Sequence, residues 1–127
     1  PMTRREQCGP CCRMDNPLPL MDAARSVVDG VNELLDEPGS HLLYDDQLRE
    51  PAESIAANIR EAYGRRAGRE RNQFLRYARG SAEETDEHLR ANLRASRITS
   101  KQYWPLHHRL TVIVRMLNSL MNKSVAS

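Results

Sequence analysis

The chain has 127 residues, of which 39% are apolar, 28% are charged and 5% are aromatic, with a formal net charge of +2. This length suits one domain with its own core, and the composition favours a helical bundle over a β fold. The chain has no run of 18 apolar residues and no apolar stretch of a secretory signal at its start, so we expect a cytoplasmic protein without membrane contact.

Residues 1–17 contain three prolines and show no hydrophobic periodicity, which predicts a flexible N-terminal tail before a bundle domain at residues 18–127. The C-G-P-C sequence from Cys8 to Cys11 matches the thioredoxin-type motif, but that chemistry needs a helix N-terminus on a βαβ scaffold. A zinc site at Cys8, Cys11 and Cys12 would lack a nearby fourth ligand. We therefore expect exposed thiols, prone to intermolecular disulfides, and no metal or cofactor.

Beyond the tail, four segments repeat apolar residues at alternating steps of three and four, the spacing of one helical face. The four sets are Leu20, Ala24, Val27, Val31 and Leu34; Leu48, Ala52, Ile55, Ile59 and Ala62; Phe74, Ala78, Ser81 or Ala82, Thr85, Leu89 and Leu93; and Tyr103, Leu106, Leu110, Ile113, Leu117 and Leu120. They predict four helices. The stretch 42–44 is too short for a strand, and we expect it to pack over one end of the bundle.

The breaks between these segments fall at residues 37–40, 64–68 and 96–100, which are rich in glycine, proline, serine and arginine. Short connections between long helices mean antiparallel neighbours, so the sequence predicts an all-α, up-down-up-down four-helix bundle. Four residues are candidate N-caps, because their side-chain oxygens can accept from free backbone N–H groups: Asp45 or Asp46, and Thr99 or Ser100.

Two prolines fall near the starts of predicted helices. Pro51 is tolerated only in the first turn of its helix and would otherwise kink it. Pro105 falls near the first turn of the last helix, although the cap of that helix could equally lie at Tyr103 or Trp104.

The most informative stretch runs S-I-A-A-N-I-R-E-A-Y-G-R at residues 54–65 and F-L-R-Y-A-R-G-S-A-E-E at residues 74–84. It resembles the small four-helix-bundle proteins encoded in intervening sequences of bacterial large-subunit ribosomal RNA genes. Their superfamily includes the accessory variability proteins of diversity-generating retroelements. Ala56, Arg60 and Ala62 depart from the family pattern of proline, alanine and glycine. The resemblance implies a four-helix bundle in a ring, typically a pentamer, with an RNA- or DNA-linked role in some relatives.

Charge is divided unevenly along the chain, with a net charge of −8 over residues 15–62 and +8 over residues 63–127. Three explanations remain open: attraction between the two halves within one chain, attraction between subunits, or an anionic partner for the basic half. The arginines concentrate around the second loop. Guanidinium groups suit phosphates, and Tyr63 and Tyr77 could stack on bases. The candidate nucleic-acid-binding residues are Arg65, Arg66, Arg69, Arg71, Arg76 and Arg79.

Other polar groups favour structural roles. His88, His107 and His108 lack metal-ligand spacing, and the acidic run 83–87 is expected to be a solvated face, with Arg79 and Glu83 as an i,i+4 pair. Asn58 beside the second apolar set resembles a register device, and Gly80-Ser81 should let helices approach closely. Tyr103 and Trp104 are expected to cap the core or anchor an interface.

The resemblance implies a homo-oligomer. Because no nucleophile–base pair or metal-ligand set is visible, we expect a non-enzymatic protein without a cofactor. RNA or DNA is its expected partner. The alternative is a structural scaffold that binds another protein and uses its charge asymmetry for ring assembly.

Overall fold

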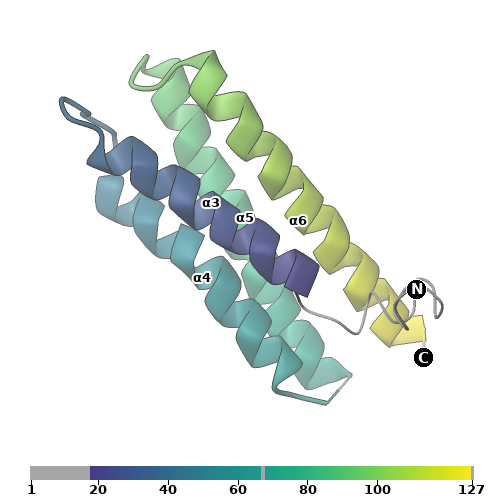
Figure 1. The fold of residues 1–127 in the computed structure, drawn as a ribbon. Coiled ribbons are helices and arrows are strands. Elements are labelled where there is room, and N and C mark those ends of the chain that lie inside the picture. The colour runs from purple at the N-terminus through teal and green to yellow at the C-terminus, as the bar shows by residue number, and fades with distance from the viewer. Residues whose placement is uncertain (1–17, 67, 127) are drawn as a thin grey trace, which may run out of the picture.

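The computed structural model describes residues 18–66 and 68–126, and these contain four α-helices and no strand (Figure 1). The helices are α3 (Leu18–Asp36), α4 (Asp45–Tyr63), α5 (Arg69–Arg94) and α6 (Ser100–Ala126). The predicted all-α class and the number of helices are confirmed. The predicted tail at residues 1–17, with Cys8, Cys11 and Cys12, lies outside the described residues.

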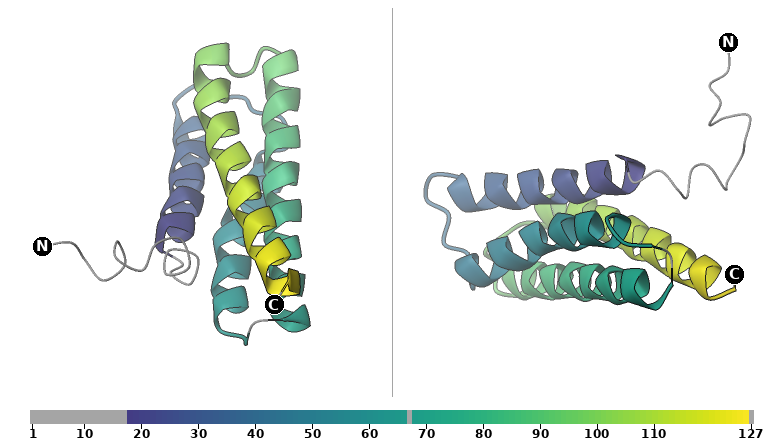
Figure 2. Two further views of the ribbon diagram at one scale, coloured as in Figure 1. Left: turned by 90° about the vertical axis from the view of Figure 1, so that its right-hand side faces the viewer. Right: turned by 90° about the horizontal axis from the view of Figure 1, so that it is seen from below.

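Each helix packs mainly on two others, α4 on α3 and α5, and α6 on α5 and α3. Helices α4 and α6 therefore lie on opposite sides of the bundle (Figure 2). The α3–α4 and α5–α6 connections lie at one end, and the α4–α5 loop lies at the other (Figure 1). We call the end with the α4–α5 loop, residues 64–68, the basic end.

No described helix is long and apolar enough to span a membrane.

The core follows the predicted helical faces. Every member of the first two sets is buried, and so are five of the six members of the fourth, with Leu120 half-buried. The third set is only partly right. Leu75 is buried in place of Phe74, which is half-buried at the edge of the core, and Leu93 is also half-buried. Sequence spacing alone does not distinguish two adjacent apolar residues such as Phe74 and Leu75.

Helix α6 begins with the predicted cap at Thr99. The Thr99 hydroxyl accepts from the backbone N–H of Gln102 at 3.2 Å, and the Gln102 side chain accepts from the backbone N–H of Thr99 at 2.8 Å. This is a capping box. The expected position of the α4 cap at Asp45 or Asp46 is wrong, although Asp45 Oδ1 accepts from the backbone N–H of Asp46 at 2.8 Å. The N-cap residue is Tyr44, in the left-handed region at φ 57°, and it makes no side-chain cap bond.

Both prolines lie inside helices, Pro51 as the seventh residue of α4 and Pro105 as the sixth residue of α6. Pro51 is therefore beyond the first turn, and it is buried. Its ring supplies apolar surface to the core at a position where the helix loses one backbone hydrogen bond.

The two glycines inside helices, Gly30 and Gly80, differ in what lies beside them. A Cβ at Gly80 would meet no atom within 4 Å, so the prediction that Gly80 allows close helix approach is wrong. A Cβ at Gly30 would lie 2.5 Å from Leu106 Cδ2, so Gly30 is where α3 and α6 pack closely.

Polar side chains fix two contacts between elements. The Asn58 amide donates to the Ser54 hydroxyl at 2.9 Å, and Ser81 donates to the same hydroxyl at 2.9 Å, which joins α4 to α5. At the other end, the buried Asn92 side chain bonds both the N–H and the C=O of Leu43, at 2.6 and 3.1 Å. Leu42 packs against the core, so the stretch 42–44 covers one end of the bundle as predicted.

Candidate nucleic-acid interface

The basic end holds a dense arginine cluster. Residues 60–79 contain seven arginines against two glutamates. Helix α4 ends at Tyr63, and α5 starts at Arg69 after Gly68, whose φ of 128° belongs to the region that favours glycine. The turn therefore brings arginines from the end of one helix, from the loop and from the start of the next helix to one end of the bundle.

Three of the six predicted arginines are held by neighbouring side chains. Arg65 donates to Glu61 and Glu70, and its guanidinium lies 4.7 Å from the centre of the Phe74 ring. The hydrogen bonds to Glu61 and then Glu70 raise the pKa of Arg65 above its usual value. These contacts connect α4 to the first turns of α5 and hold the Arg65 side chain of the loop against the Phe74 ring.

Arg71 and Arg79 have similar supporting contacts. The guanidinium of Arg71 lies 4.4 Å from the centre of the Tyr63 ring, a cation–π contact between α5 and α4. Arg79 donates to Asn118 Oδ1 at 2.7 Å, which joins α5 to α6. The expected Arg79–Glu83 pair does not form among the described side chains.

The other three arginines are exposed. Within the described part of the chain, no side-chain hydrogen bond, ion pair or ring contact is made by Arg66, Arg69 or Arg76. Arg69, Gln73 and Arg76 are spaced i, i+4 and i+7, so they share one face of α5. That face presents unpartnered guanidinium groups to solvent at the basic end.

An exposed aromatic ring lies beside these arginines. Tyr77 is 50% exposed, and its ring meets the Phe74 ring edge-on at 5.8 Å and 89°. Gln73 donates to the Tyr77 hydroxyl at 2.7 Å. Tyr63, the other tyrosine expected to stack on a base, is half-buried and covered by Arg71.

A polar cluster between α5 and α6 was missed by sequence reasoning. Asp86 Oδ1 lies 2.9 Å from His107 Nδ1 and accepts from the Tyr103 hydroxyl at 3.1 Å. Arg90 donates to Asp86 Oδ2 at 3.1 Å and to the Tyr103 hydroxyl at 3.3 Å. The signal was two i,i+4 pairs, Asp86 with Arg90 and Tyr103 with His107. Asp86 is thus part of an interhelical contact, whereas Glu83, Glu84 and Glu87 are exposed as predicted.

The aromatic pair at the start of α6 divides between core and surface. Tyr103 is buried, whereas Trp104 is 56% exposed and lies edge-on to the rings of Tyr103 and His107. The polar cluster around Asp86 therefore stabilises the α5–α6 contact. The aromatic rings packed against it extend to the surface at Trp104.

Burial raises the pKa of the Tyr103 phenol above its ordinary value. The folded protein then holds the phenol proton more tightly than the unfolded chain does. Its contribution to stability is complete below about pH 10 and is lost as the pH rises through the folded value. We expect Tyr103→Phe to flatten the alkaline decline of the free energy of unfolding, measured by urea unfolding between about pH 8 and pH 11. Equal declines in the two proteins would contradict this assignment.

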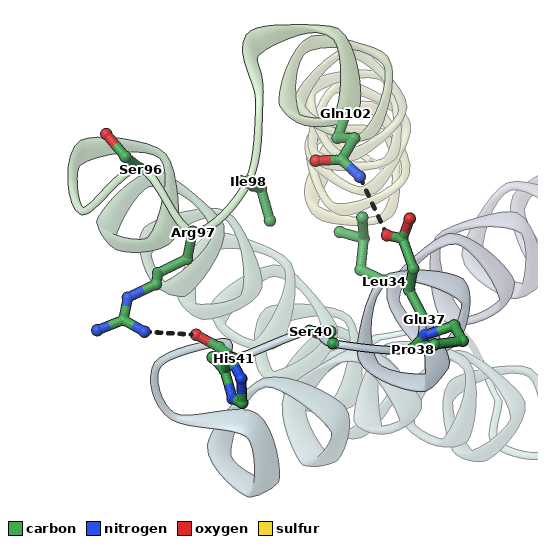
Figure 3. Close-up of a pocket in the computed structure, with 10 residues that line it drawn as sticks. Leu34, Glu37, Pro38, Ser40, His41, Ser96, Arg97, Ile98 and Gln102 are labelled. Atoms are coloured by element: carbon green, nitrogen blue, oxygen red, sulfur yellow. Dashed lines mark hydrogen bonds between the residues drawn. The ribbon is translucent and has the colours of Figure 1, made fainter.

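A pocket of about 370 Å³ lies at the end opposite the basic end, between the α3–α4 and α5–α6 connections (Figure 3). Leu34 and Ile98 form an apolar floor. Gln102 donates to Glu37 at 3.4 Å on one side, and Arg97 donates to the His41 carbonyl at 3.2 Å on the other. These bonds hold the two connections together. No group of three or more metal-binding side chains gathers within the described residues.

Comparison with known proteins places this fold in a family. The family model for the 23S rRNA-intervening sequence protein matches residues 20–119. A protein of unknown function from the S23 ribosomal protein family of Bacteroides thetaiotaomicron is 28% identical, with a TM-score of 0.72 over 80% of this chain and 97% of that chain. No curated protein matches the chain. The resemblance seen in residues 54–65 and 74–84 is thereby confirmed, and the chain belongs to the family of 23S rRNA-intervening sequence proteins.

Proposed function

We propose that the protein is a non-enzymatic, antiparallel up-down-up-down bundle that binds nucleic acid through its basic end. The observation that carries this proposal is the exposed set Arg66, Arg69 and Arg76, which lacks partners among the described residues. In this proposal three other arginines have a structural role and hold the surface in one conformation. The contacts that do so are Arg65 with Phe74, Arg71 with Tyr63 and Arg79 with Asn118. A surface that is held in one conformation and carries free guanidinium groups suits phosphate recognition.

The distribution of charge supports an external partner. If the acidic and basic halves attracted each other within one chain, ion pairs should cross between them. Among the described residues, the one ion pair across the 62/63 boundary is Arg65–Glu61, which is a local i,i+4 contact. The remaining positive charge of the basic end is therefore available to an anionic partner. The family description names 23S rRNA, which makes RNA the first ligand to test.

The test is RNA affinity across a salt series, from about 50 mM to 1 M salt. Each phosphate neutralised by the protein releases counterions, so the logarithm of affinity should fall linearly with the logarithm of salt concentration. A steep slope supports phosphate binding at the basic end. Absence of binding to RNA and to DNA at low salt would rule out the proposed function.

Self-assembly is a second candidate, favoured by the placement of charge on α4 and α6. Exposed carboxylates line α4, namely Asp45, Asp46, Glu50, Glu53 and Glu61. Helix α6 contains no acidic residue and exposes Lys101, Arg109 and Arg115. The two helices lie on opposite sides of the bundle, so the acidic face of one copy can meet the basic face of the next. Such head-to-tail contacts close into rings when the rotation allows it, and the resemblance implies a pentamer.

Charge reversal tests this assembly. Changing Glu50 and Glu53 to lysine should dissociate the oligomer, because like charges would face each other across the interface. Adding Lys101→Glu and Arg109→Glu to that variant should restore the oligomer. Sedimentation velocity at fixed protein concentration and low salt measures both steps. Two outcomes would contradict assembly through these two faces. The oligomer could persist in the first variant, or the second pair of changes could fail to restore it.

A further inference from the structure

We propose that Tyr77 is a base-stacking residue and that the basic end therefore binds single-stranded nucleic acid in preference to a duplex. This inference rests on the proposed function, because it names the form of nucleic acid that the same surface takes. It assigns to one aromatic side chain a role separate from phosphate binding.

The three aromatic rings at the basic end are not equally accessible. Arg65 lies over the Phe74 ring at 4.7 Å, and Arg71 lies over the Tyr63 ring at 4.4 Å. Tyr77 is 50% exposed, and no cation–π contact covers its ring among the described residues. Of the three rings it is the most exposed, and its surface is available to a base.

The orientation of the Tyr77 ring is fixed before any ligand binds. Its hydroxyl accepts from Gln73 at 2.7 Å, one turn earlier in α5. The ring also meets Phe74 edge-on at 5.8 Å, and Phe74 is in turn held under Arg65. A side chain that is already ordered loses less conformational entropy on binding, so stacking on this ring is favoured over stacking on a mobile one.

Gly80 leaves space beside the ring. It is three residues after Tyr77 and therefore its neighbour on the helix surface. Gly80 is exposed, and a Cβ placed there would meet no atom within 4 Å. The glycine is not required by helix packing, and a glycine in a helix interior costs stability. An uncovered backbone next to an exposed ring gives a base a place to lie against.

Free positive charge lies next to this ring. Arg76 adjoins Tyr77 in sequence, and Arg69 is seven residues before Arg76 on the same face of α5, roughly 10 Å along the helix axis. One strand can therefore place its phosphates near the two arginines while a base lies on Tyr77. Arginine-rich grooves with aromatic rings for successive bases are how many proteins bind single strands without sequence preference.

A duplex does not fit this combination. Its base faces are covered by their neighbours in the stack, and exposing one costs a few kcal/mol in unstacking. Duplex binding at this surface would rest on phosphate contacts alone. Tyr77 should therefore matter for single strands and not for duplexes, whereas the arginines should matter for both.

The test compares Tyr77→Ala with wild type on a 20-nucleotide oligouridylate and on a blunt RNA duplex of equal length, at one salt concentration. We expect the variant to bind the single strand about 5- to 150-fold more weakly and the duplex unchanged. Tyr77→Trp should retain single-strand binding because it keeps an aromatic face. Tyr44→Ala is the matched control, since Tyr44 is 53% exposed and is the last residue of the α3–α4 connection, at the other end of the bundle. Thermal unfolding of each variant checks that the fold is retained.

Two results would overturn the inference. Equal affinities of wild type and Tyr77→Ala for the single strand would show that the ring does not stack on a base. Equal losses on single strand and duplex would show that the change disturbs the surface as a whole. In both cases a steep salt dependence would leave the proposed function intact. If wild type binds neither probe at low salt, the proposed function itself fails.

Discussion

Changing Asn92 to leucine should lower the free energy of unfolding by about 2–4 kcal/mol, a large effect for one polar side chain. Asn92 is fully buried, and its amide bonds the backbone N–H and C=O of Leu43 and the C=O of His88. Leucine has a similar size but cannot replace these bonds. The partly buried backbone groups of Leu43 would then lose their partners, which is the costly way to break a hydrogen bond. Urea unfolding at fixed protein concentration measures the change.

The same substitution at Asn72 is a matched control within α5. Asn72 is 5% exposed, and its Oδ1 has no hydrogen-bond partner among the residues that the structure describes. Asn72→Leu removes an unpaired polar atom, so we expect stability to stay the same or to rise by up to about 1 kcal/mol. Equal losses for Asn72→Leu and Asn92→Leu would mean that the size of the new side chain sets the cost. The role assigned to the Asn92 hydrogen bonds would then be wrong.

The contrast between these two asparagines shows why the sequence predicted the core better than the polar contacts. Apolar periodicity is a property of one helix, so residues such as Val27, Ile55 and Ile113 were placed correctly without knowledge of the neighbouring helix. The partner of Asn92 is 49 residues away in the chain. Its position follows from how the helices pack, and no local pattern marks it.

The same reasoning explains the two errors at glycine and at the cap of α4. Close approach depends on which residue of the facing helix arrives opposite, and Leu106 arrives opposite Gly30 while Gly80 faces open space. At the start of α4, the two aspartates suggested a cap. The connection instead reaches the helix through Tyr44 in a left-handed conformation, which leaves both aspartates inside the first turn. Acidic residues are still favourable there, because they face the positive end of the helix dipole.

The candidate site was partly predictable in the same way. The number of arginines around residues 64–68 is visible in the sequence. Which of them are free is a tertiary property, because Arg65, Arg71 and Arg79 are held by partners on other elements or in other turns. The structure thus separates one cluster into supporting arginines and exposed ones, and that division shows which arginines an experiment should change.

Changing Arg66, Arg69 and Arg76 to glutamine should weaken RNA binding by about 100-fold at 0.1 M salt, with the difference vanishing towards 1 M. For a single strand, three lost phosphate contacts should reduce the salt slope by about 2. Glutamine is shorter than arginine and carries no charge, but it is polar and has a similar helix propensity, so the fold should be unaffected. Affinity measured across the salt series gives both the slope and its change.

A second triple variant separates this surface from total charge. Arg25, Arg94 and Arg97 are also exposed but lie outside the arginine cluster of residues 60–79, and their change to glutamine removes the same net charge. If the two triple variants lose equal affinity, RNA responds to the overall charge of the protein and the basic end has no special role. If only the variant of the basic end loses affinity while its oligomer persists, the free arginines bind phosphate. If that variant dissociates instead, these arginines meet a neighbouring subunit. The three arginines would then contribute to assembly and not to RNA binding. The opposite charges of α4 and α6 are a separate argument for such assembly.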